Sequence, residues 1–414
     1  GFVSICSFKN EEKGKIIFVQ RLISKTLSGR SDFINRAYFI FSNRVIKSQD
    51  NTYDEECISG LEALIKLFFD ICNEEPDNQK LIDLIKKIGE SKILVVGDLA
   101  LDEMVYGDTE RISREAPVLI LQHTHTKFIL GGASNAAHNV SEINGGKVSV
   151  IGIIGDDYQA NDLKNAFKEA NIDCSSLIVD KCRKTITKTR ISGSCSHSIT
   201  QQIVRIDRQT NAPISKETET KMIAEIEKLV PLHDAVILSD YHICTLTKNI
   251  IKKAIEIANK YNKIIIADAQ KNLDNYYGVT SMTPNQPDTE KFVGYYIKDD
   301  ETLNKAGFEL LNKTNAKYVL VTRGEEGMAI FDKQNNVYKI PAFNKTKVFD
   351  VTGAGDTVVA AYSLALAAKM TPYEAAFVAN IAASIVIREF GCATTNIQTI
   401  CEKIKNMKFD ELEK

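Results

Sequence analysis

The sequence predicts an α/β fold: a mostly parallel sheet covered by helices on both faces, with a small β lid and a helical N-terminal extension. Short, almost continuous apolar runs recur from position 92 onward, as buried parallel strands require. Segments of helical period separate these runs, and strands that alternate with helices indicate βαβ units. Apolar residues make up 44% and charged residues 26% of the 414 positions, which is typical of a chain with a sizeable core.

The chain begins with a segment, residues 1–90, that we interpret as a helical extension ahead of a main domain at 91–414. Apolar side chains at helical spacing run through residues 55–73. A short amphipathic helix follows, with its apolar positions at Leu81, Leu84, Ile85 and Ile88. Two roles stay open for the extension: a helical prefix packed on the main domain, or a segment that binds a partner.

The main domain is predicted from its apolar runs and the helices between them. Strands are expected at Ile93–Val96, Val148–Ile153, Ala235–Leu238, Lys263–Ala267 and Tyr318–Val321. Amphipathic helices are expected at Asn161–Ala170, Lys216–Leu229, Leu246–Tyr261 and Glu301–Lys313. Two long apolar helices, starting near Gly355 and Pro372, are expected to close the core.

Two stretches, Val105–Leu130 and Thr185–Asp207, break this rhythm. They are rich in Thr, Ile and Val, alternate with polar residues and have no helical period. We predict that they form antiparallel strands of a lid that projects from the main sheet. An exposed β lid can also pair two subunits, so we expect a homodimer through it.

Charge and cysteine usage exclude several classes of partner. The net charge of −2 gives no global attraction to nucleic acid or to a membrane surface. No run approaches the ~18 consecutive apolar residues of a membrane span. The nine cysteines are scattered without a Cys-x-x-Cys pair, and the N-terminus lacks the pattern of a signal peptide. We therefore expect a cytoplasmic protein with reduced thiols.

The segment 349–357 carries the clearest sign of chemistry. Its glycines allow a tight turn directly before a long helix, and backbone N–H groups at a helix N-terminus bind anions. Asp356 lies beside that anion site, where a carboxylate would ordinarily repel a phosphate. The conflict is resolved if Asp356 accepts a proton from an attacking hydroxyl group. The alternative reading is that Asp356 only caps the helix.

The run Asp350-Val-Thr-Gly-Ala-Gly-Asp356 resembles the signature of the ribokinase-like, or PfkB, carbohydrate kinases. Further segments between residues 92 and 400 resemble motifs of that family in the expected order: Gly97-Asp-Leu-Ala-Leu-Asp102, Gly131-Gly-Ala-Ser-Asn135, Thr283-Pro-Asn285 and Thr322-Arg-Gly-Glu-Glu-Gly327. The resemblance implies a ribokinase-like fold, with ATP and Mg²⁺ as cofactors and a monovalent cation as an optional third.

The resemblance also implies a role for each motif. Asp356 becomes the catalytic base, and the amides of Gly353, Ala354 and Gly355 form the anion hole. The sugar is assigned to Asp102, Gly131, Gly132 and Asn135. The nucleotide is assigned to Asn285, Thr322, Gly324, Gly327 and Asn380, and magnesium to Asp288. For Asn380, a polar residue satisfied at a helix interface is a nearly equal alternative to a place beside the adenine.

Within the family, the chain most resembles the heptose-7-phosphate kinases of ADP-heptose synthesis. The likeness is carried by Arg111-Ile-Ser-Arg-Glu-Ala-Pro-Val118, by Ser239-Asp-Tyr241, and by the lid segments Thr185–Arg190 and Gln202–Asp207. Lys188, Arg190 and Arg205 on this lid suit a substrate that already bears a phosphate, because basic side chains pair with its oxygens. Taken singly, each of them fits a solvated strand face better. Their concentration around the predicted substrate lid makes the two readings about even.

The chain departs from the family pattern at three places. His242-Ile-Cys244 stands where Lys-Gly is usual, and Asp268-Ala-Gln270 stands where Asp-Pro-Lys is usual. Two expected lysines are therefore absent, at the positions of Ile243 and Gln270. The Asn-x-x-Glu motif tied to magnesium ends here in Asp288, a shorter carboxylate that still can hold the ion through water.

These residues together predict an ATP-dependent sugar kinase whose substrate is a heptose 7-phosphate, phosphorylated at its anomeric hydroxyl. One alternative is a kinase for another sugar, such as a ribose- or fructose-like substrate. The other is a regulatory protein that binds nucleotide or sugar but has lost turnover, which the missing lysines motivate and the intact Asp356 opposes.

Overall fold

The structure is a computed structural model that describes residues 78–406, except 195–199, 344–349 and 390. The chain divides into two compact units, residues 1–78 with 413–414 and residues 79–412. The second unit contains the sheets and helices of the main domain. The expected helical extension lies almost entirely outside the described residues, so both of its predicted roles stay open.

An eight-stranded sheet forms the centre of the main domain, in the order β14-β13-β12-β11-β10-β9-β1-β4. The pairings from β4 to β12 are parallel, and β12, β13 and β14 are antiparallel. The strands run over β1 Ile93–Gly97, β4 Val148–Ile151, β9 Ala235–Asp240, β10 Ile264–Ala269, β11 Ser281–Met282, β12 Tyr318–Thr322, β13 Met328–Asp332 and β14 Val337–Ile340. The predicted, mostly parallel sheet is confirmed.

One expected strand, Val148–Ile153, is divided in the structure. Its first part is β4, and its end belongs to β5 (Ile153–Ile154), which pairs with β6 (Ile178–Val179) in a separate two-stranded sheet. Gly152 marks the break, where a Cβ atom would lie 2.5 Å from a methyl carbon of Leu99. The close approach of Leu99 explains why only glycine fits at this position.

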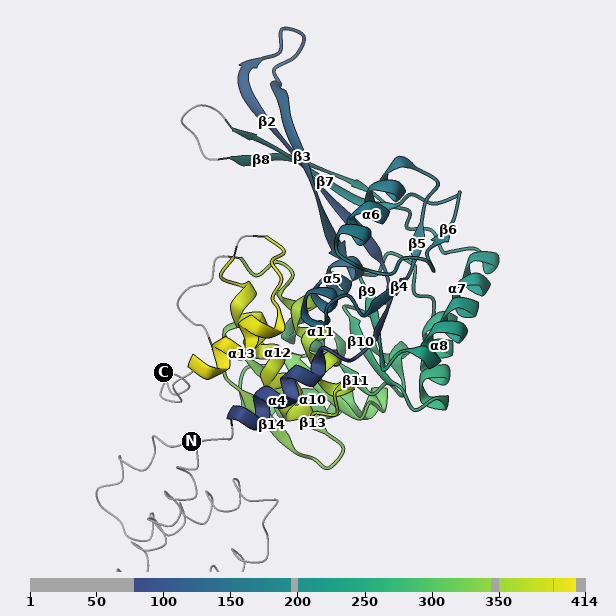
Figure 1. The fold of residues 1–414 in the computed structure, drawn as a ribbon, viewed down its shortest axis with the longest axis vertical. Helices are drawn as coiled ribbons and strands as arrows, with labels where there is room; N and C mark the ends of the chain where they lie inside the picture. Colours follow the sequence, from purple (N-terminus) through teal and green to yellow (C-terminus); the bar gives the residue numbers. More distant parts are fainter. Residues whose placement is uncertain (1–77, 195–199, 344–349, 390, 407–414) are drawn as a thin grey trace, which may run out of the picture. The chain divides into compact units, whose positions relative to one another are not determined.

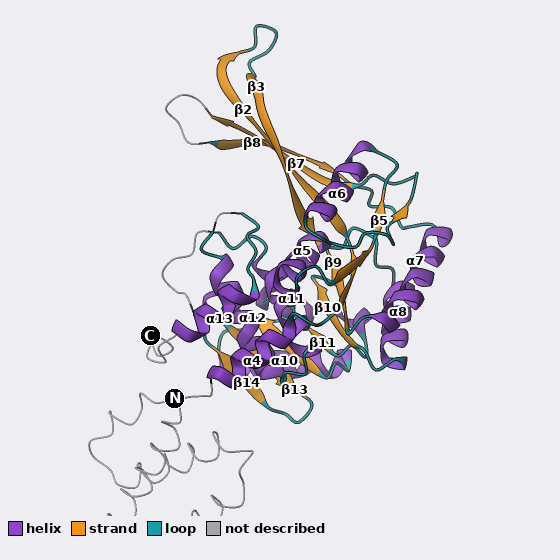
Figure 2. Ribbon diagram, viewed as in Figure 1, coloured by secondary structure: helices purple, strands orange, loops and turns teal. Residues whose placement is uncertain are grey.

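Helices cover both faces of the large sheet (Figure 2). They span α4 Asn78–Ile88, α5 Ala133–Asn144, α6 Tyr158–Glu169, α7 Lys216–Leu229, α8 Lys248–Lys260, α9 Gln286–Val293, α10 Asp300–Thr314, α11 Ala354–Ala367, α12 Pro372–Val386 and α13 Ile397–Asn406. Alternate residues of β1 point to opposite faces, so Ile93 and Val95 belong to one hydrophobic cluster and Leu94 and Val96 to the other.

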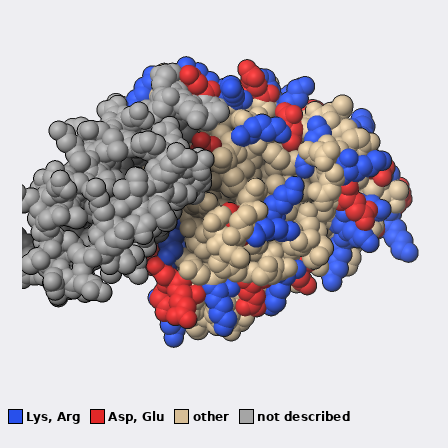
Figure 3. Space-filling view, turned by 90° about the horizontal axis from the view of Figure 1, so that it is seen from below, with Lys and Arg blue, Asp and Glu red and all other residues tan. Residues whose placement is uncertain are grey.

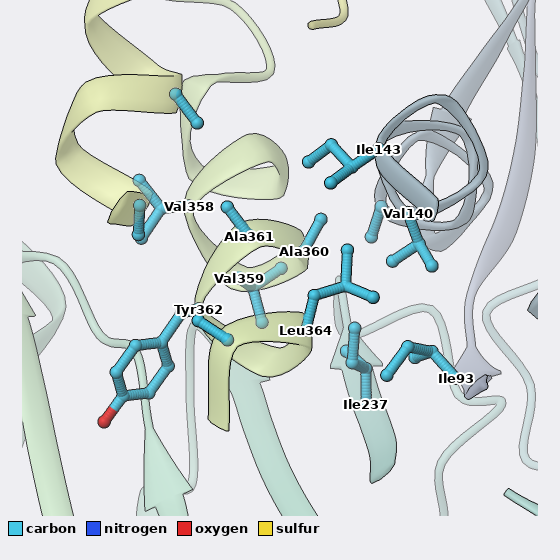
Figure 4. Close-up of a cluster of buried hydrophobic side chains, with 14 of the residues drawn as sticks. Ile93, Val140, Ile143, Ile237, Val358, Val359, Ala360, Ala361, Tyr362 and Leu364 are labelled. Atoms are coloured by element: carbon cyan, nitrogen blue, oxygen red, sulfur yellow. The ribbon is translucent and has the colours of Figure 1, made fainter. Parts of the chain in front are cut away.

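The first of these clusters holds the helix that carries the candidate site. Figure 4 shows Val359, Ala360 and Leu364 of α11 between the strand residues Ile93 and Ile237 and the α5 residues Val140 and Ile143. Almost every side chain of α11 is buried. Packing on both sides therefore fixes the position of its N-terminal end relative to the sheet.

Helix α4 also packs into this cluster, through Ile82, Ile85 and Ile88. All three side chains are at most 3% exposed. Residues 79–88 belong to the same compact unit as the sheet. The short amphipathic helix expected near the end of the extension is thus part of the core of the main domain.

A second sheet, β3-β2-β7-β8, extends away from the main body as a lid (Figure 1). Its strands are β2 Leu99–Ile112, β3 Leu119–Gly132, β7 Ile186–Ser194 and β8 Gln201–Arg208. The pairs β2–β3 and β7–β8 are antiparallel as predicted, but β2 and β7 run parallel. Both strands leave the main domain in the same direction, which is why the two hairpins join through a parallel pairing, on which the sequence made no prediction.

The described residues were compared with two patterns, a membrane-spanning helix and a face of a single charge sign. No helix among the described residues combines the length and apolar character needed to cross a bilayer. On the face drawn in Figure 3, basic and acidic side chains of the described residues are interspersed. This mixture agrees with a net charge of −2 over the whole sequence.

Candidate active site

The candidate site is built on the turn that begins α11. Gly353 precedes the helix with φ 77°, in the left-handed region that glycine adopts without strain. A Cβ atom on Gly353 would lie 2.7 Å from Nδ2 of Asn135, whereas one on Gly355 would meet nothing within 4 Å. The amide of Ala354 donates to the carbonyl of Val351 at 3.2 Å. Of the three amides assigned to the anion hole, that of Ala354 is therefore directed into the turn in this structure.

Asp356 lies in the first turn of α11 and is 5% exposed. Nδ2 of Asn135 donates to its Oδ2 at 2.6 Å, and the hydroxyl of Tyr241 donates to its Oδ1 at 2.7 Å. Burial raises the pKa of Asp356 to about 6, although both hydrogen bonds and the charge of Lys188 lower it. A carboxyl with this pKa is ionised at neutral pH and can still accept a proton, as a general base must.

A cavity of about 140 Å³ opens in front of Asp356. Its walls come from the carboxyl ends of parallel strands: Asp240 ends β9, Asp268 lies near the end of β10, and Thr322 ends β12. The loop after β11 adds Asn285, and the first turn of α9 adds Asp288. Ligands of open α/β sheets bind at this edge.

The carboxylates of this cavity are electrostatically crowded. Burial, together with the nearby charges of Asp356, Asp288 and Asp240, raises the pKa of Asp268 to about 7. Among the described residues, no three acidic, histidine or cysteine side chains form a ready cluster for a metal ion. The donors fit Mg²⁺ in another way, because that ion is commonly held by one or two carboxylates together with substrate phosphates and water.

The residues assigned to the sugar lie on the lid side of Asp356. Nη1 of Arg190 is 2.9 Å from Oδ1 of Asp102. Neither of these two buried atoms makes an aligned hydrogen bond, so the contact is an ion pair. Nη1 of Arg190 can still donate a hydrogen bond, and Oδ1 of Asp102 can still accept one. A Cβ atom on Gly131 would lie 3.1 Å from the carboxyl group of Asp102, which explains the glycine at that position. The charge of Asp102 also raises the pKa of Asp356, which indicates that the two carboxylates are close.

The three basic residues predicted on the lid differ in their surroundings. The ammonium of Lys188 lies 6.0 Å from the centre of the Tyr241 ring and lowers the pKa of Asp356. Arg190 pairs with Asp102. Arg205 is paired with exposed Asp207, at 2.8 Å and 3.0 Å. The structure thus brings Lys188 and Arg190 to the site and leaves Arg205 in an exposed pair on β8.

Of the residues assigned to the nucleotide, Asn285 and Thr322 line the cavity. Asn285 caps α9 by accepting from the amide of Asp288, and a bridge pairs it with Thr322. Gly324 and Gly327 have φ 55° and 85°. Nδ2 of Asn380 donates to the carbonyl of Pro341 at 2.7 Å. That bond is the one expected of a satisfied helix-interface residue, and contact of Asn380 with an adenine stays a prediction.

Two functional groups were not assigned a role from sequence. Tyr241 contacts Asp356 directly, and Asp98 accepts three backbone amides, from Tyr241, Ile243 and Thr245. Burial raises the pKa of Asp98. The signals were the polar residues directly after β1 and β9, because side chains at the ends of adjacent parallel strands meet at one edge of a sheet.

Comparison with known proteins places the geometry in context. A family model described as pfkB family carbohydrate kinase matches residues 90–400. The chain is 37% identical over 311 residues to the bifunctional protein HldE of Aliarcobacter butzleri, covering 75% of this chain and 63% of that protein. It is 38% identical over 304 residues to HldE of Geobacter metallireducens, covering 73% and 61%. The chain thus spans less than two thirds of the length of these curated relatives.

Solved structures agree on the fold. Phosphofructokinase-2 from Escherichia coli in complex with potassium superimposes with a TM-score of 0.60 at 18% identity, over 76% of this chain and 98% of that one. Ribokinase from Thermotoga maritima gives a TM-score of 0.57 at 21% identity, over 76% and 100%. The predicted ribokinase-like fold is confirmed.

Proposed function

The chain belongs to the pfkB family of carbohydrate kinases, and on that premise we propose that it transfers a phosphoryl group from ATP to the anomeric hydroxyl of a heptose 7-phosphate. The observation that carries the proposal is the buried carboxylate of Asp356 at the N-terminus of α11, facing a cavity at the carboxyl ends of the sheet. The HldE relatives support the heptose phosphate as the substrate class.

In the proposed reaction, Asp356 accepts the proton of the anomeric hydroxyl. The sugar oxygen then forms a bond to the γ-phosphorus of ATP, the bond to the bridging oxygen breaks, and ADP leaves with its electron pair. Amides at the start of α11, those of Gly353 and Gly355 with Ala354 next to them, stabilise the charge on the transferring group. Catalysis of this kind is mostly positioning and electrostatics.

Mg²⁺, when bound with the nucleotide, neutralises charge on the phosphate oxygens. Asp288 is the residue that we assign to it, acting through water. Its backbone amide is fixed by Asn285 at 2.7 Å, and Oδ1 of Asp288 lies 3.0 Å from the ammonium of Lys291. Thr322, Gly324 and Gly327 bind the nucleotide on the far side of Asn285. The potassium named for phosphofructokinase-2 supports a monovalent cation as an optional cofactor.

The sugar phosphate binds between the main domain and the lid. Asp102, with Gly131 and Gly132 beside it, holds the sugar hydroxyls, and Asn135 orders the site next to Asp356. Lys188 and Arg190 supply positive charge within the site, and Arg205 adds to it from β8. The ion pair of Arg190 with Asp102 holds both side chains in place before the substrate arrives.

We also propose that the protein acts as a homodimer through the lid and works in the cytoplasm. Apolar side chains on the lid are strongly exposed: Ile112 at 63%, Val118 at 56%, Leu119 at 54%, and Ile203 and Val204 at 45% each. Ile112 and Leu119 are paired across β2 and β3, and adjoining exposed apolar side chains of this kind are typical of a protein interface. The free cysteines among the described residues suit a reducing compartment.

One observation favours a second candidate, a binding protein without turnover. Gln270 lines the cavity where the family pattern has a lysine, so the site has less positive charge for phosphate than its relatives. An activity assay distinguishes the kinase from the binding protein. ATP consumption coupled to product detection, over a panel of free and phosphorylated sugars, should show turnover on heptose 7-phosphate.

The panel separates the candidates because each predicts a different pattern. Turnover on free sugars with none on heptose 7-phosphate would replace the proposed substrate with another sugar. Binding of ATP and sugar without product on any member of the panel would leave the regulatory protein as the better account. The unphosphorylated heptose is the matched control, since it differs from the proposed substrate only by the phosphate that Lys188 and Arg190 are assigned to bind.

A further inference from the structure

We propose that Tyr241 is a positioning residue for phosphoryl transfer: its hydroxyl group, together with the amide of Asn135, holds the carboxylate of Asp356 in the orientation that accepts the substrate proton. This inference rests on the proposed role of Asp356 as the base. The two donors approach different oxygens, Tyr241 at 2.7 Å from Oδ1 and Asn135 at 2.6 Å from Oδ2. A carboxylate held at both oxygens cannot rotate freely about its side-chain bond.

The two donors come from parts of the main domain that are themselves fixed. Asn135 lies in the first turn of α5 and is 1% exposed. Its neighbour Asn139 donates to the Asn135 carbonyl and accepts from the hydroxyl of Thr357, the residue after Asp356. The N-terminal turns of α5 and α11 are thus joined at two adjacent positions.

Tyr241 is held by a different set of contacts. Asp98, which is fully buried, accepts its backbone amide at 2.9 Å and also accepts the amides of Ile243 and Thr245. Arg183 donates to the carbonyl of Ile243 at 3.1 Å. The loop is fixed so firmly that His242 and Cys244 keep φ values of 64° and 66°. Residues other than glycine rarely adopt such values. A loop fixed to this degree holds its tyrosine as a rigid donor.

The charges around Asp356 show why a second donor matters. Burial disfavours its ionised form, and the carboxylate of Asp102 on β2 disfavours it further. Asp268 on β10 also interacts with it unfavourably. Lys188 on β7 is the cation that favours ionisation. The thiol of Cys392 is neutral, because burial raises its pKa to about 11.

Tyr241 itself does not titrate in the working range. Burial and the adjacent Asp356 raise its pKa well above 10, so the hydroxyl stays protonated and remains a donor. Hydrogen bonds to the charged form of an acid lower its pKa. Loss of the hydroxyl group should therefore raise the pKa of Asp356 and reduce the fraction of ionised base at neutral pH.

The test is Tyr241→Phe, which removes one oxygen and keeps the ring. The titration of Asp356 is followed by carboxyl-carbon NMR of the full chain labelled at aspartate, with its signal assigned by loss in Asp356→Asn. The wild-type midpoint is expected near pH 6, as its pKa of about 6 requires. The midpoint should rise in Tyr241→Phe, and the acid limb of the kcat/KM profile, which reports the free enzyme, should move upward by the same amount.

Tyr276→Phe is the matched control. Tyr276 is also buried and donates at 2.7 Å to a carboxylate of the same cavity, that of Asp240, so its variant loses an equivalent hydroxyl group without touching Asp356. Its Asp356 midpoint should equal the wild-type value. An unchanged midpoint in Tyr241→Phe, or an equal rise in both variants, would overturn the proposal.

The NMR arm needs no turnover and so separates two failures. If the midpoint rises in Tyr241→Phe but no sugar is phosphorylated by the wild-type protein, the contact is real and the proposed function is wrong. If the wild-type protein is an active kinase and the midpoint does not move, the positioning role is wrong.

Discussion

At the scale of single residues, the site depends on a carboxylate whose burial opposes its own ionisation. The short run around Asp356 predicts this residue because glycines, acid and helix start are adjacent in sequence. Its two donors could not be predicted in the same way, since Asn135 is 221 positions away and Tyr241 is 115 positions away. Local patterns indicate which strand ends are polar, but not which polar groups meet.

Residue patterns also marked the places where the chain departs from its relatives, and the structure gives one of them a physical consequence. His242 and Cys244 keep left-handed backbone angles in the loop that follows β9. A non-glycine residue in that region costs about 1–3 kcal/mol in the folded state. Substitution by glycine recovers only part of this free energy, because glycine is also more flexible in the unfolded chain. The loop therefore holds strain next to the site.

We predict that Cys244→Gly raises the free energy of unfolding by about 0.5–1 kcal/mol, because glycine adopts the same backbone angles without strain. Urea unfolding of the full chain measures the change. Cys182→Gly is the control, since Cys182 is exposed and its φ is not positive. That variant should be neutral or less stable than the wild-type protein. A loss of stability in Cys244→Gly larger than in the control would refute the strain argument.

At the scale of elements, the helices and strands of the large sheet follow from sequence because each has a clear period. The pairing within the lid does not, since β2 and β7 are parallel although their hairpin partners are antiparallel. Strand residues alternate in the same way in both arrangements, so periodicity cannot distinguish them. Likewise α4 has the pattern of a surface helix, and only the structure shows Ile82, Ile85 and Ile88 in the core.

The lid is also the element that carries the dimer proposal. Val204→Lys places a charge within the exposed apolar side chains of β8, and it should weaken the dimer about tenfold or more, since roughly 1–2 kcal/mol is lost per disrupted interface contact. Sedimentation velocity over a range of concentrations measures the change. Leu232→Lys is the control, because Leu232 is 64% exposed but lies outside the lid. A monomeric wild-type protein, or equal weakening in both variants, would contradict a lid interface.

At the scale of the whole molecule, the fold explains why residues from distant segments form one site. Parallel strands β9, β10, β11 and β12 end at the same edge, the lid strands β2 and β7 begin beside it, and α11 begins there after the last strand. The sequence predicts this architecture because each segment is locally consistent with it. It does not predict the cavity, which exists only once these ends have come together.

The most direct test of the account is the rate of phosphoryl transfer to heptose 7-phosphate by the wild-type protein and by Asp356→Asn between pH 5 and pH 9, with the anomeric phosphate detected by phosphorus NMR. The pKa of Asp356 is raised to about 6, so the base is ionised above that pH, and wild-type kcat should fall as the pH drops through it. Asp356→Asn should lose roughly 10²–10⁴-fold in kcat on the alkaline plateau. A variant as active as the wild-type protein, or a wild-type profile flat through pH 6, would contradict Asp356 as the base.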